Sequence, residues 1–187
     1  AAMTARLVGI LGKKRAGKDS AAAGLIAAGY QRRGFADPLK AMALAIDPWI
    51  RTDDLYEGAL LSTWVDDLGW EGAKAIHEVR RFLQVLGTEG VREHIGHDAW
   101  VNVFLDAWTD AGFPPTVAPD VRFQNEAHAI KSDGGVLIRI IRPGQPMSDD
   151  HASEAAAALI PVHFEVLNDS TVEELQRQVL QIVEGWT

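Results

Sequence analysis

The chain carries, at residues 5–20, the stretch Ala-Arg-Leu-Val-Gly-Ile-Leu-Gly-Lys-Lys-Arg-Ala-Gly-Lys-Asp-Ser, and its fold class can be predicted outward from here. The apolar residues before Gly12 indicate a short buried strand. Gly12 and Gly17 then bracket four residues, and Lys18 follows at once. The Ala-rich segment 20–28 indicates a helix. A strand, the pattern Gly-x-x-x-x-Gly-Lys and a helix in this order predict a loop that binds phosphate groups.

The spacing of this loop has a physical explanation. Backbone N–H groups of the loop and of the new helix converge on one spot, which the helix dipole makes attractive to anions. Glycines allow the backbone angles and the close approach that a side chain would prevent. Lys18 can then reach the outer phosphates of a nucleoside triphosphate. The ordinary alternative is a glycine-rich turn between a strand and a helix that happens to carry a lysine.

The residue after the lysine departs from the usual pattern. Asp19 stands where a serine or threonine is common, and Ser20 comes one position later. Either residue could serve a magnesium ion, Ser20 through its hydroxyl and Asp19 through a water molecule. The sequence leaves both arrangements open.

Composition limits the classes of protein that need to be considered. With 187 residues, of which 47% are hydrophobic and 24% charged, we expect one globular domain. No run is apolar enough to span a membrane, no signal-peptide pattern occurs and cysteine is absent, so we expect a cytoplasmic protein without a membrane partner. The net charge of −8 argues against nucleic acid as the main partner, whereas local groups of basic residues suit small phosphorylated ligands.

Strand and helix patterns alternate along the rest of the chain. Further strands are expected at 31–36, 116–121, 136–141 and 162–167, and helices from Asp37, over 74–86, 100–111 and 125–131, and from Thr171. Asp37 is expected to be an N-cap, and Thr171 is expected to form a capping box with Glu174. This alternation predicts a three-layer α/β fold, a five-stranded parallel sheet flanked by helices, with the site at the carboxyl ends of the strands.

One segment, residues 47–73, is expected to be irregular, because prolines and glycines interrupt it. It contains three tryptophans, Trp49, Trp64 and Trp70. Their rings could line a substrate site, but packing beneath a long connection is the more common explanation.

Charged residues at a strand end and on one helix face are further candidates for the site. Asp120, at the end of an apolar strand, stands where a carboxylate can organise magnesium, and Arg122 could hold a phosphate with two hydrogen bonds. Arg80 and Gln84 share a helix face because they are four residues apart. The alternative for each is ordinary: a hydrated aspartate at a strand end, and helix charges that face solvent.

These motifs resemble those of the deoxynucleoside monophosphate kinases of bacteriophages and some bacteria, over most of the chain. The matching residues are Gly12-Lys13-Lys14-Arg15-Ala16-Gly17-Lys18-Asp19-Ser20, Phe35-Ala36-Asp37-Pro38-Leu39-Lys40, Arg80-x-x-Leu83-Gln84, Leu86-Gly87-Thr88-Glu89, Arg92, Asp98-x-Trp100-Val101, Asp120-Val121-Arg122-Phe123-x-Asn125-Glu126, Arg142-Pro143-Gly144, His151-x-Ser153-Glu154 and Asn168-Asp169. The resemblance implies that Asp19 is typical of the family. The Trp-rich segment is less familiar and leaves base specificity open.

The resemblance implies a single P-loop kinase domain, with a fold like that of nucleoside monophosphate kinases and a short lid at 142–158. The core would cover 5–46 and 114–187, and a helical substrate-binding insert would cover 47–113. The activity implied is transfer of the γ-phosphoryl group of ATP to a deoxynucleoside monophosphate, with Mg²⁺ as cofactor. The protein would act on small nucleotides in the cytoplasm, that of the host if a phage encodes it. The sequence leaves open whether it forms a homodimer.

The resemblance also implies roles for individual residues. The catalytic candidates are Lys18, Arg15, Arg122 and Arg142. The candidate ATP-binding residues are Gly12, Lys13, Lys14, Arg15, Ala16, Gly17, Lys18, Asp19 and Ser20. The candidate substrate-binding residues are Asp37, Lys40, Arg80, Gln84, Thr88, Glu89, Arg92 and Trp100. Among them, Arg80 and Arg92 would hold the acceptor phosphate. The candidate metal ligands are Asp19, Ser20 and Asp120.

Other functions are also compatible with a phosphate-binding loop. One is a kinase for a different small acceptor, such as dephospho-coenzyme A or phosphomevalonate. A hydroxyl acceptor needs a base, which Asp37 could provide. Another is a regulatory module that binds ATP without turning it over. A polynucleotide kinase is disfavoured by the acidic net charge.

Overall fold

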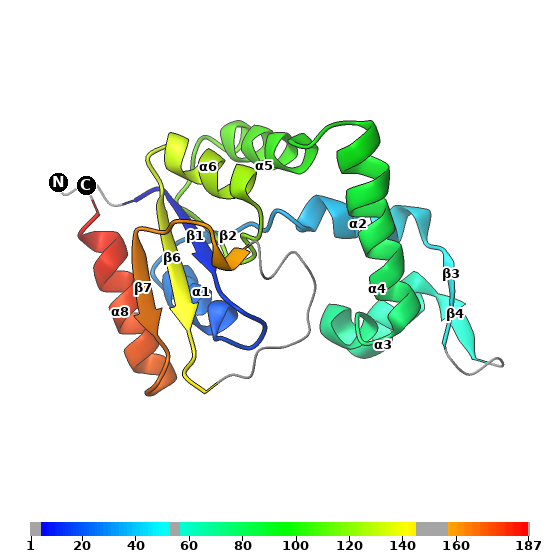
Figure 1. Cartoon of the computed structure of the whole chain (residues 1–187), viewed down its shortest axis with the longest axis horizontal. Helices are drawn as coiled ribbons and strands as arrows, with labels where there is room; N and C mark the ends of the chain where they lie inside the picture. Colours follow the sequence, from blue (N-terminus) through cyan, green and yellow to red (C-terminus); the bar gives the residue numbers. More distant parts are fainter. Residues whose placement is uncertain (1–4, 53–56, 145–156, 187) are drawn as a thin grey trace. The chain divides into compact units, whose positions relative to one another are not determined.

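The computed structural model describes residues 5–52, 57–144 and 157–186, and these residues form two compact units (Figure 1). Unit 1 comprises the described residues of Ala1–Phe35 and Phe104–Thr187, and unit 2 comprises those of Ala36–Val103. The His151-x-Ser153-Glu154 motif and most of the expected lid, residues 145–156, lie outside the described ranges. No helix within those ranges is long and apolar enough to cross a lipid bilayer.

Unit 1 contains the predicted parallel sheet. Its five strands lie in the order β2-β5-β1-β6-β7, and every neighbouring pair is parallel. Their bounds are β1 Leu7–Leu11, β2 Gln31–Arg32, β5 Thr116–Ala118, β6 Val136–Ile141 and β7 Phe164–Leu167. The predicted fold class is therefore confirmed. Because the strands are parallel, the segments that follow them emerge at the same edge of the sheet. Those that follow β5, β1 and β6 are neighbours there, since β1 lies between β5 and β6.

Helices cover both faces of this sheet (Figure 1). They are α1 Lys18–Ala27, α6 Gln124–Ser132 and α8 Val172–Glu184. Successive side chains of a strand point to opposite faces. Val8 and Ile10 of β1 belong to one buried cluster with residues of α1 and α8. On the other face, a side chain at Gly9 would lie 2.5 Å from Ile130 of α6, so this glycine lets α6 pack directly on the central strand.

Unit 2 is mostly helical. Its elements are α2 Asp37–Ile46, β3 Trp49–Arg51, β4 Gly58–Leu60, α3 Leu61–Ala73, α4 His77–Gln84, the π-helix η1 Val85–Arg92 and the start of α5 Ala99–Asp110. Its core is formed by Ala43, Ile50, Leu61, Ala73 and Val79. Trp64 and Trp70 pack against this core, as the sequence favoured, whereas Trp49 is 63% exposed.

The expectation that residues 47–73 are irregular is wrong. β3 and β4 pair as an antiparallel hairpin, with Trp49 opposite Leu60, and α3 follows. A side chain at Gly58 would lie 2.6 Å from the indole nitrogen of Trp49. Gly69, at φ 65° and ψ 170°, forms a break within α3. The glycines of this segment therefore mark a close approach and a kink, and not an unstructured connection.

Three strands are shorter than predicted. β2 ends at Arg32 and not at 36, β5 ends at Ala118 and not at 121, and β7 begins at Phe164 and not at 162. The physical reason is clearest beyond β2 and β5. There the backbone N–H of Phe35 donates to the carboxylate of Asp120 at 3.0 Å, so a side chain and not a strand accepts this hydrogen bond.

Helix boundaries also need correction. α1 begins at Lys18, two positions before the predicted start at residue 20, and the N-cap of α2 is Ala36, so that Asp37 is the first helical residue. The helix expected over 74–86 begins at His77, and after Gln84 the chain continues as the π-helix η1. A π-helix is rare, and the apolar spacing used to predict helices has the period of the α-helix, so the sequence carries no signal for η1.

The predicted start of α8 is confirmed. Thr171 is its N-cap, and the Thr171 hydroxyl accepts a hydrogen bond from the Glu174 N–H at 3.2 Å. The Glu174 carboxylate binds Arg177 and Gln178, and these hydrogen bonds lower its pKa to about 2. The structure thus shows the Thr171 half of the predicted capping box.

His163 lies just before β7, an edge strand of the sheet, and its side chain contacts both β6 and Trp186. Its Nδ1 accepts a hydrogen bond from the Leu137 N–H at 2.9 Å, which requires that nitrogen to be unprotonated. Its ring lies 4.5 Å from the ring of Trp186, centre to centre. Desolvation, and secondly the positive charge of Lys131, lower the pKa of His163.

We predict that acidification destabilises the protein through His163. Because the pKa of this ring is lower in the folded state, the unfolded chain binds the proton first, and stability falls as the pH drops below about 6.5. Melting temperatures at about pH 7.5 and pH 5.5 measure this loss. His163→Asn can accept the same hydrogen bond without titrating and should lose less. His128→Asn, on α6, is the control and should behave as wild type. Equal losses in wild type and His163→Asn would contradict the prediction.

Candidate active site

The predicted phosphate-binding loop connects β1 to α1 at the carboxyl edge of the sheet. Three of its residues have positive φ: Gly12 (150°), Arg15 (63°) and Gly17 (107°). A side chain at Gly12 would lie 2.6 Å from the carbonyl oxygen of Ile140 in the neighbouring β6. The left-handed conformation of Arg15 is unfavourable for a residue with a side chain, and such strain gathers at functional sites. The loop therefore has a shape that only glycine at position 12 permits.

Lys18 reaches back across this loop. It is the first residue of α1, directly after the N-cap Gly17, and its Nζ donates to the carbonyl oxygens of Gly12 and Lys13, both at 2.7 Å. A hydrogen bond from the Ala16 N–H to the Lys13 carbonyl, at 3.1 Å, tightens the turn. The ammonium group thus lies beside the first turn of α1, whose N–H groups attract anions.

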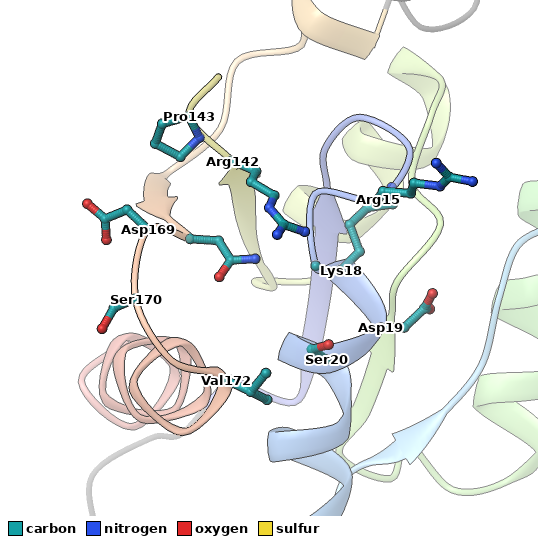
Figure 2. Close-up of a pocket in the computed structure, with 11 residues that line it drawn as sticks. Arg15, Lys18, Asp19, Ser20, Arg142, Pro143, Asp169, Ser170 and Val172 are labelled. Carbon is teal, nitrogen blue, oxygen red and sulfur yellow. The ribbon is translucent and has the colours of Figure 1, made fainter. Parts of the chain in front are cut away.

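A cavity of about 680 Å³ opens beside the loop (Figure 2). Its lining comes from three segments of unit 1: the loop with the start of α1, the end of β6, and the turn from β7 to α8. These residues are Arg15, Gly17, Lys18, Asp19, Ser20, Arg142, Pro143, Asn168, Asp169, Ser170 and Val172. Three cations and two carboxylates (Asp19 and Asp169) line it together with other polar groups, and the excess of positive charge suits a phosphorylated ligand.

The basic side chains that line the cavity point in different directions. Figure 2 shows Arg142 reaching from the end of β6 toward the start of α1, where Lys18 lies. Arg15 and Asp19 extend away from Arg142. Positive charges that line one cavity favour an anion there. Lys18 and Arg142 both belong to the lining, so they are candidates for holding a phosphate.

The structure brings part of the predicted site together at this cavity. Six of the predicted residues line it: Arg15, Gly17, Lys18, Asp19, Ser20 and Arg142. Gly12, Lys13, Lys14 and Ala16 belong to the loop but are not among the lining residues. From the sequence, Asn168-Asp169 is among the family-like residues, but no residue of the turn 168–172 was predicted to have a role in the site. One signal could have found it: Asn168 directly follows a predicted strand, and the carboxyl ends of parallel strands meet at one edge.

Asp120 and Arg122 follow β5 and are not among the lining residues. The Asp120 carboxylate accepts the N–H of Phe35 and so joins the segments that follow β2 and β5. The backbone N–H of Arg122 donates at 2.8 Å to the carboxylate of Glu126, a side chain only 3% exposed, while the Arg122 side chain is exposed. The metal and phosphate contacts of Asp120 and Arg122 stay predictions.

The predicted substrate-binding residues all lie in unit 2. They are Asp37 and Lys40 on α2, Arg80 and Gln84 on α4, Thr88, Glu89 and Arg92 on η1, and Trp100 on α5. Arg92, 8% exposed, donates to the carbonyl of His97 at 3.2 Å. Trp100, 5% exposed, donates its indole N–H to the carbonyl of Gly87 at 3.0 Å. These two residues hold η1 in place, and the substrate contacts of the whole set stay predictions.

The donor atoms at the start of α1 fit a magnesium ion. Asp19 contributes a carboxylate and Ser20 a hydroxyl to the cavity lining, and Mg²⁺ prefers oxygen ligands. Within the described ranges, no three His, Cys, Asp or Glu side chains come together as a metal site. A magnesium ion here would therefore take most of its ligands from water and from phosphate oxygens, as it commonly does in sites that transfer phosphate.

Comparison with known proteins identifies the family. Residues 71–179 match the family model described as deoxynucleotide monophosphate kinase. A protein of Acanthamoeba polyphaga mimivirus that is assigned to the same kind of kinase is 33% identical over 192 residues, which cover 96% of this chain and 96% of that protein. The chain belongs to the deoxynucleotide monophosphate kinase family.

Other relatives match a smaller part. The deoxynucleotide monophosphate kinase of Enterobacteria phage T4 is 32% identical over 100 residues, 52% of this chain and 42% of that protein. That of Escherichia phage RB69 is 28% identical over 108 residues, 56% of this chain and 44% of that protein. Among solved structures, a dephospho-CoA kinase from Campylobacter jejuni is similar with a TM-score of 0.49 and 15% identity, over 96% of each chain.

The matches to the family model and to the mimivirus protein confirm the family and the enzyme class that the sequence predicted. Membership of this family implies ATP as co-substrate and nucleotides as ligands. A cavity lined by Lys18 and Arg142 beside a phosphate-binding loop agrees with both.

Gly12→Ala should weaken ADP binding by roughly tenfold or more, because the added Cβ would collide with the Ile140 carbonyl and force the loop to move. Titration calorimetry with ADP measures this change. Gly134→Ala is the matched control: its φ of 72° is also unfavourable, but no atom lies within 4 Å of the added Cβ. It should lower the melting temperature and leave ADP affinity unchanged. Full ADP affinity in Gly12→Ala would contradict the role given to this glycine.

Proposed function

We propose that the protein transfers the γ-phosphoryl group of ATP to the phosphate of a deoxynucleoside monophosphate, which yields a deoxynucleoside diphosphate and ADP. The observation that carries this proposal is the cation-lined cavity at the phosphate-binding loop of a chain that belongs to this kinase family. The loop supports binding of the donor phosphates, and the family supports the choice of acceptor.

Repulsion between phosphates is the main obstacle to this reaction. A monophosphate has a second pKa of about 6, so at neutral pH its oxygens are already largely ionised, and no base is needed to activate it. Two unit charges about 4 Å apart interact by about 4 kcal/mol at an effective dielectric constant of about 20. The transition state also spreads charge over the transferring group. Fixed cations lower both costs, so the basic lining of the site matters more than any general base.

In this proposal Lys18 neutralises the β- and γ-phosphates, and Arg15, Arg122 and Arg142 stabilise the transferring group. Lys18 has the strongest support, because its ammonium group already lies across the phosphate-binding loop. Arg142 is supported by its place in the cavity lining and by its direction (Figure 2). Arg15 lines the same cavity, and Arg122 is proposed from its sequence motif alone.

Magnesium is proposed as the cofactor. When bound, it would add positive charge at the phosphates and orient them. Asp19 and Ser20 would hold it from the first turn of α1, directly or through water, and their oxygen atoms are the donors it prefers. Asp120 is a third candidate from the sequence.

Unit 2 is proposed to bind the acceptor nucleotide. The insert expected at 47–113 overlaps unit 2 over residues 47–103. Arg80 and Arg92 are the candidates for the acceptor phosphate, since a guanidinium group can hold a phosphate with two hydrogen bonds. Arg92 belongs to η1. π-Helical segments are rare in proteins, and those that occur are often at functional sites.

A coupled assay of ADP release with the four deoxynucleoside monophosphates tests the proposal. With ATP and Mg²⁺, the wild-type protein should phosphorylate at least one of them, and should leave dephospho-coenzyme A and phosphomevalonate untouched. Lys18→Ala should lower kcat by roughly 10²-fold or more, because the donor phosphates lose their fixed cation.

The matched control is Lys74→Ala, which removes a lysine that pairs with Glu71 on α3 and should keep its turnover. Thermal melting of both variants shows whether they fold. A wild-type protein that phosphorylates no deoxynucleotide would overturn the proposed function. Near-normal turnover in Lys18→Ala would remove this lysine from the mechanism.

Arg80→Ala should raise the KM for the deoxynucleoside monophosphate by roughly tenfold and leave the KM for ATP unchanged, because only the acceptor phosphate loses its partner. Arg81→Ala is the matched control. The Arg81 side chain is 64% exposed and pairs with Glu78 at 3.5 Å, so both KM values should stay within about twofold of wild type. An unchanged KM for the monophosphate in Arg80→Ala would place Arg80 outside the acceptor site.

A further inference from the structure

We infer that Asn168, the residue after β7, positions the phosphate-binding loop by holding the peptide between Ala16 and Gly17. The inference rests on the proposed function, because it concerns the loop that would bind ATP. Asn168 is a positioning residue in this account: it acts on the backbone of the loop, 152 residues away in sequence.

The backbone of Asn168 is itself fixed by the sheet. Its N–H donates to the carbonyl of Ile141 at 2.7 Å, directly after the last pair of the β6–β7 ladder, Ile141 with Leu167. The side chain therefore projects from an anchored strand end and not from a loose connection. This anchoring allows it to serve as a fixed point for another segment.

The side-chain amide of Asn168 holds Ala16. Its Nδ2 donates to the Ala16 carbonyl oxygen at 2.8 Å, and an amide must turn its nitrogen toward such an acceptor. Ala16 is only 1% exposed, and its own N–H donates to the Lys13 carbonyl at 3.1 Å. Both backbone polar groups of Ala16 are thus satisfied, one within the loop and one by Asn168.

Holding the Ala16 carbonyl also sets the direction of the next N–H group. The peptide between Ala16 and Gly17 is trans and planar, so its C=O and N–H point in opposite directions. Asn168 therefore turns the Gly17 N–H away from itself. Gly17 lines the cavity and precedes α1, where backbone N–H groups bind phosphates in loops of this kind.

The glycine at position 17 is matched to this asparagine. A Cβ at Gly17 would lie 2.4 Å from Nδ2 of Asn168 and 3.3 Å from Cδ2 of Leu175. The amide thus occupies the space that a side chain at position 17 would need. The φ of 107° at Gly17 further excludes other residues.

A second amide of the same region provides a control. Gln176 of α8 donates its Nε2 to the carbonyl of Ser20 at 3.0 Å. This bond joins α8 to a carbonyl oxygen of the first turn of α1, which also accepts a hydrogen bond within the helix. Removing the Gln176 amide therefore tests the packing of the two helices and leaves the Ala16 carbonyl held.

The experiment compares the wild-type protein with Asn168→Ala, Asn168→Asp and Gln176→Ala. Calorimetry gives ADP affinity, steady-state kinetics give the KM values for ATP and for a deoxynucleoside monophosphate, and melting gives stability. Asn168→Ala should weaken ADP binding roughly fivefold to tenfold, and KM for ATP should rise in parallel. Asn168→Asp keeps the shape but opposes the carbonyl with a carboxylate, and its negative charge also repels the phosphates of ADP, so its loss should be larger. The KM for the monophosphate should stay within about twofold, and Gln176→Ala should keep ADP affinity.

Each other outcome overturns the inference. Asn168 variants that bind ADP as wild type does show that the amide does not position the loop. Equal losses of ADP affinity in Gln176→Ala show a general effect of α8. If Asn168→Ala fails to fold, Asn168→Leu, which has a similar size, no charge and no donor, decides by the same criterion. A wild-type protein that does not bind ADP removes the proposed donor site, and with it this inference, whereas normal binding in wild type and in the variants removes the inference alone.

Discussion

The close approach of the backbone at Gly12 and Gly17 is the constraint on which the site depends. At Gly12 the loop lies against the carbonyl oxygen of Ile140 in β6, and at Gly17 it lies against the amide of Asn168 after β7. A side chain at either position would separate the loop from the sheet. Because both contacts are to strand ends, the sheet itself determines the shape of the loop, and the loop in turn places Lys18 beside the cavity.

Positive charge in this protein is concentrated locally. The chain as a whole has a formal net charge of −8, yet Arg15, Lys18 and Arg142 line one cavity. An acidic surface disfavours nucleic acid and other polyanions, while a cationic hollow still attracts a small phosphorylated ligand. At the same edge of the sheet, two carboxylates have a structural role. Asp120 and Glu126 accept backbone N–H groups and so fix the segments around β5 before any ligand is considered.

Prediction from sequence succeeded where a local pattern is strong and failed where a pattern has two physical meanings. β6 has the predicted bounds, because a run rich in apolar β-branched residues between two turns leaves little choice. Residues 47–73 were predicted as irregular, because glycine is read as a breaker. In the structure, Gly58 makes room for Trp49 and Gly69 forms a kink, and neither role is visible without the neighbouring element. The turn 168–172 was given no role for the same reason: its contacts are with a loop far away in sequence.

The amino-acid sequence by itself determined the phosphate-binding loop, the alternation of strands and helices and the resemblance to a kinase family. All three depend on residues that are close in the chain, where spacing dictates which groups meet. Only the tertiary structure decided that Arg142 and Asn168 share a cavity with Lys18, and that unit 2 contains a β-hairpin and a π-helix. These features depend on the order of strands in the sheet and on the space between side chains, which form only when segments distant in sequence pack together.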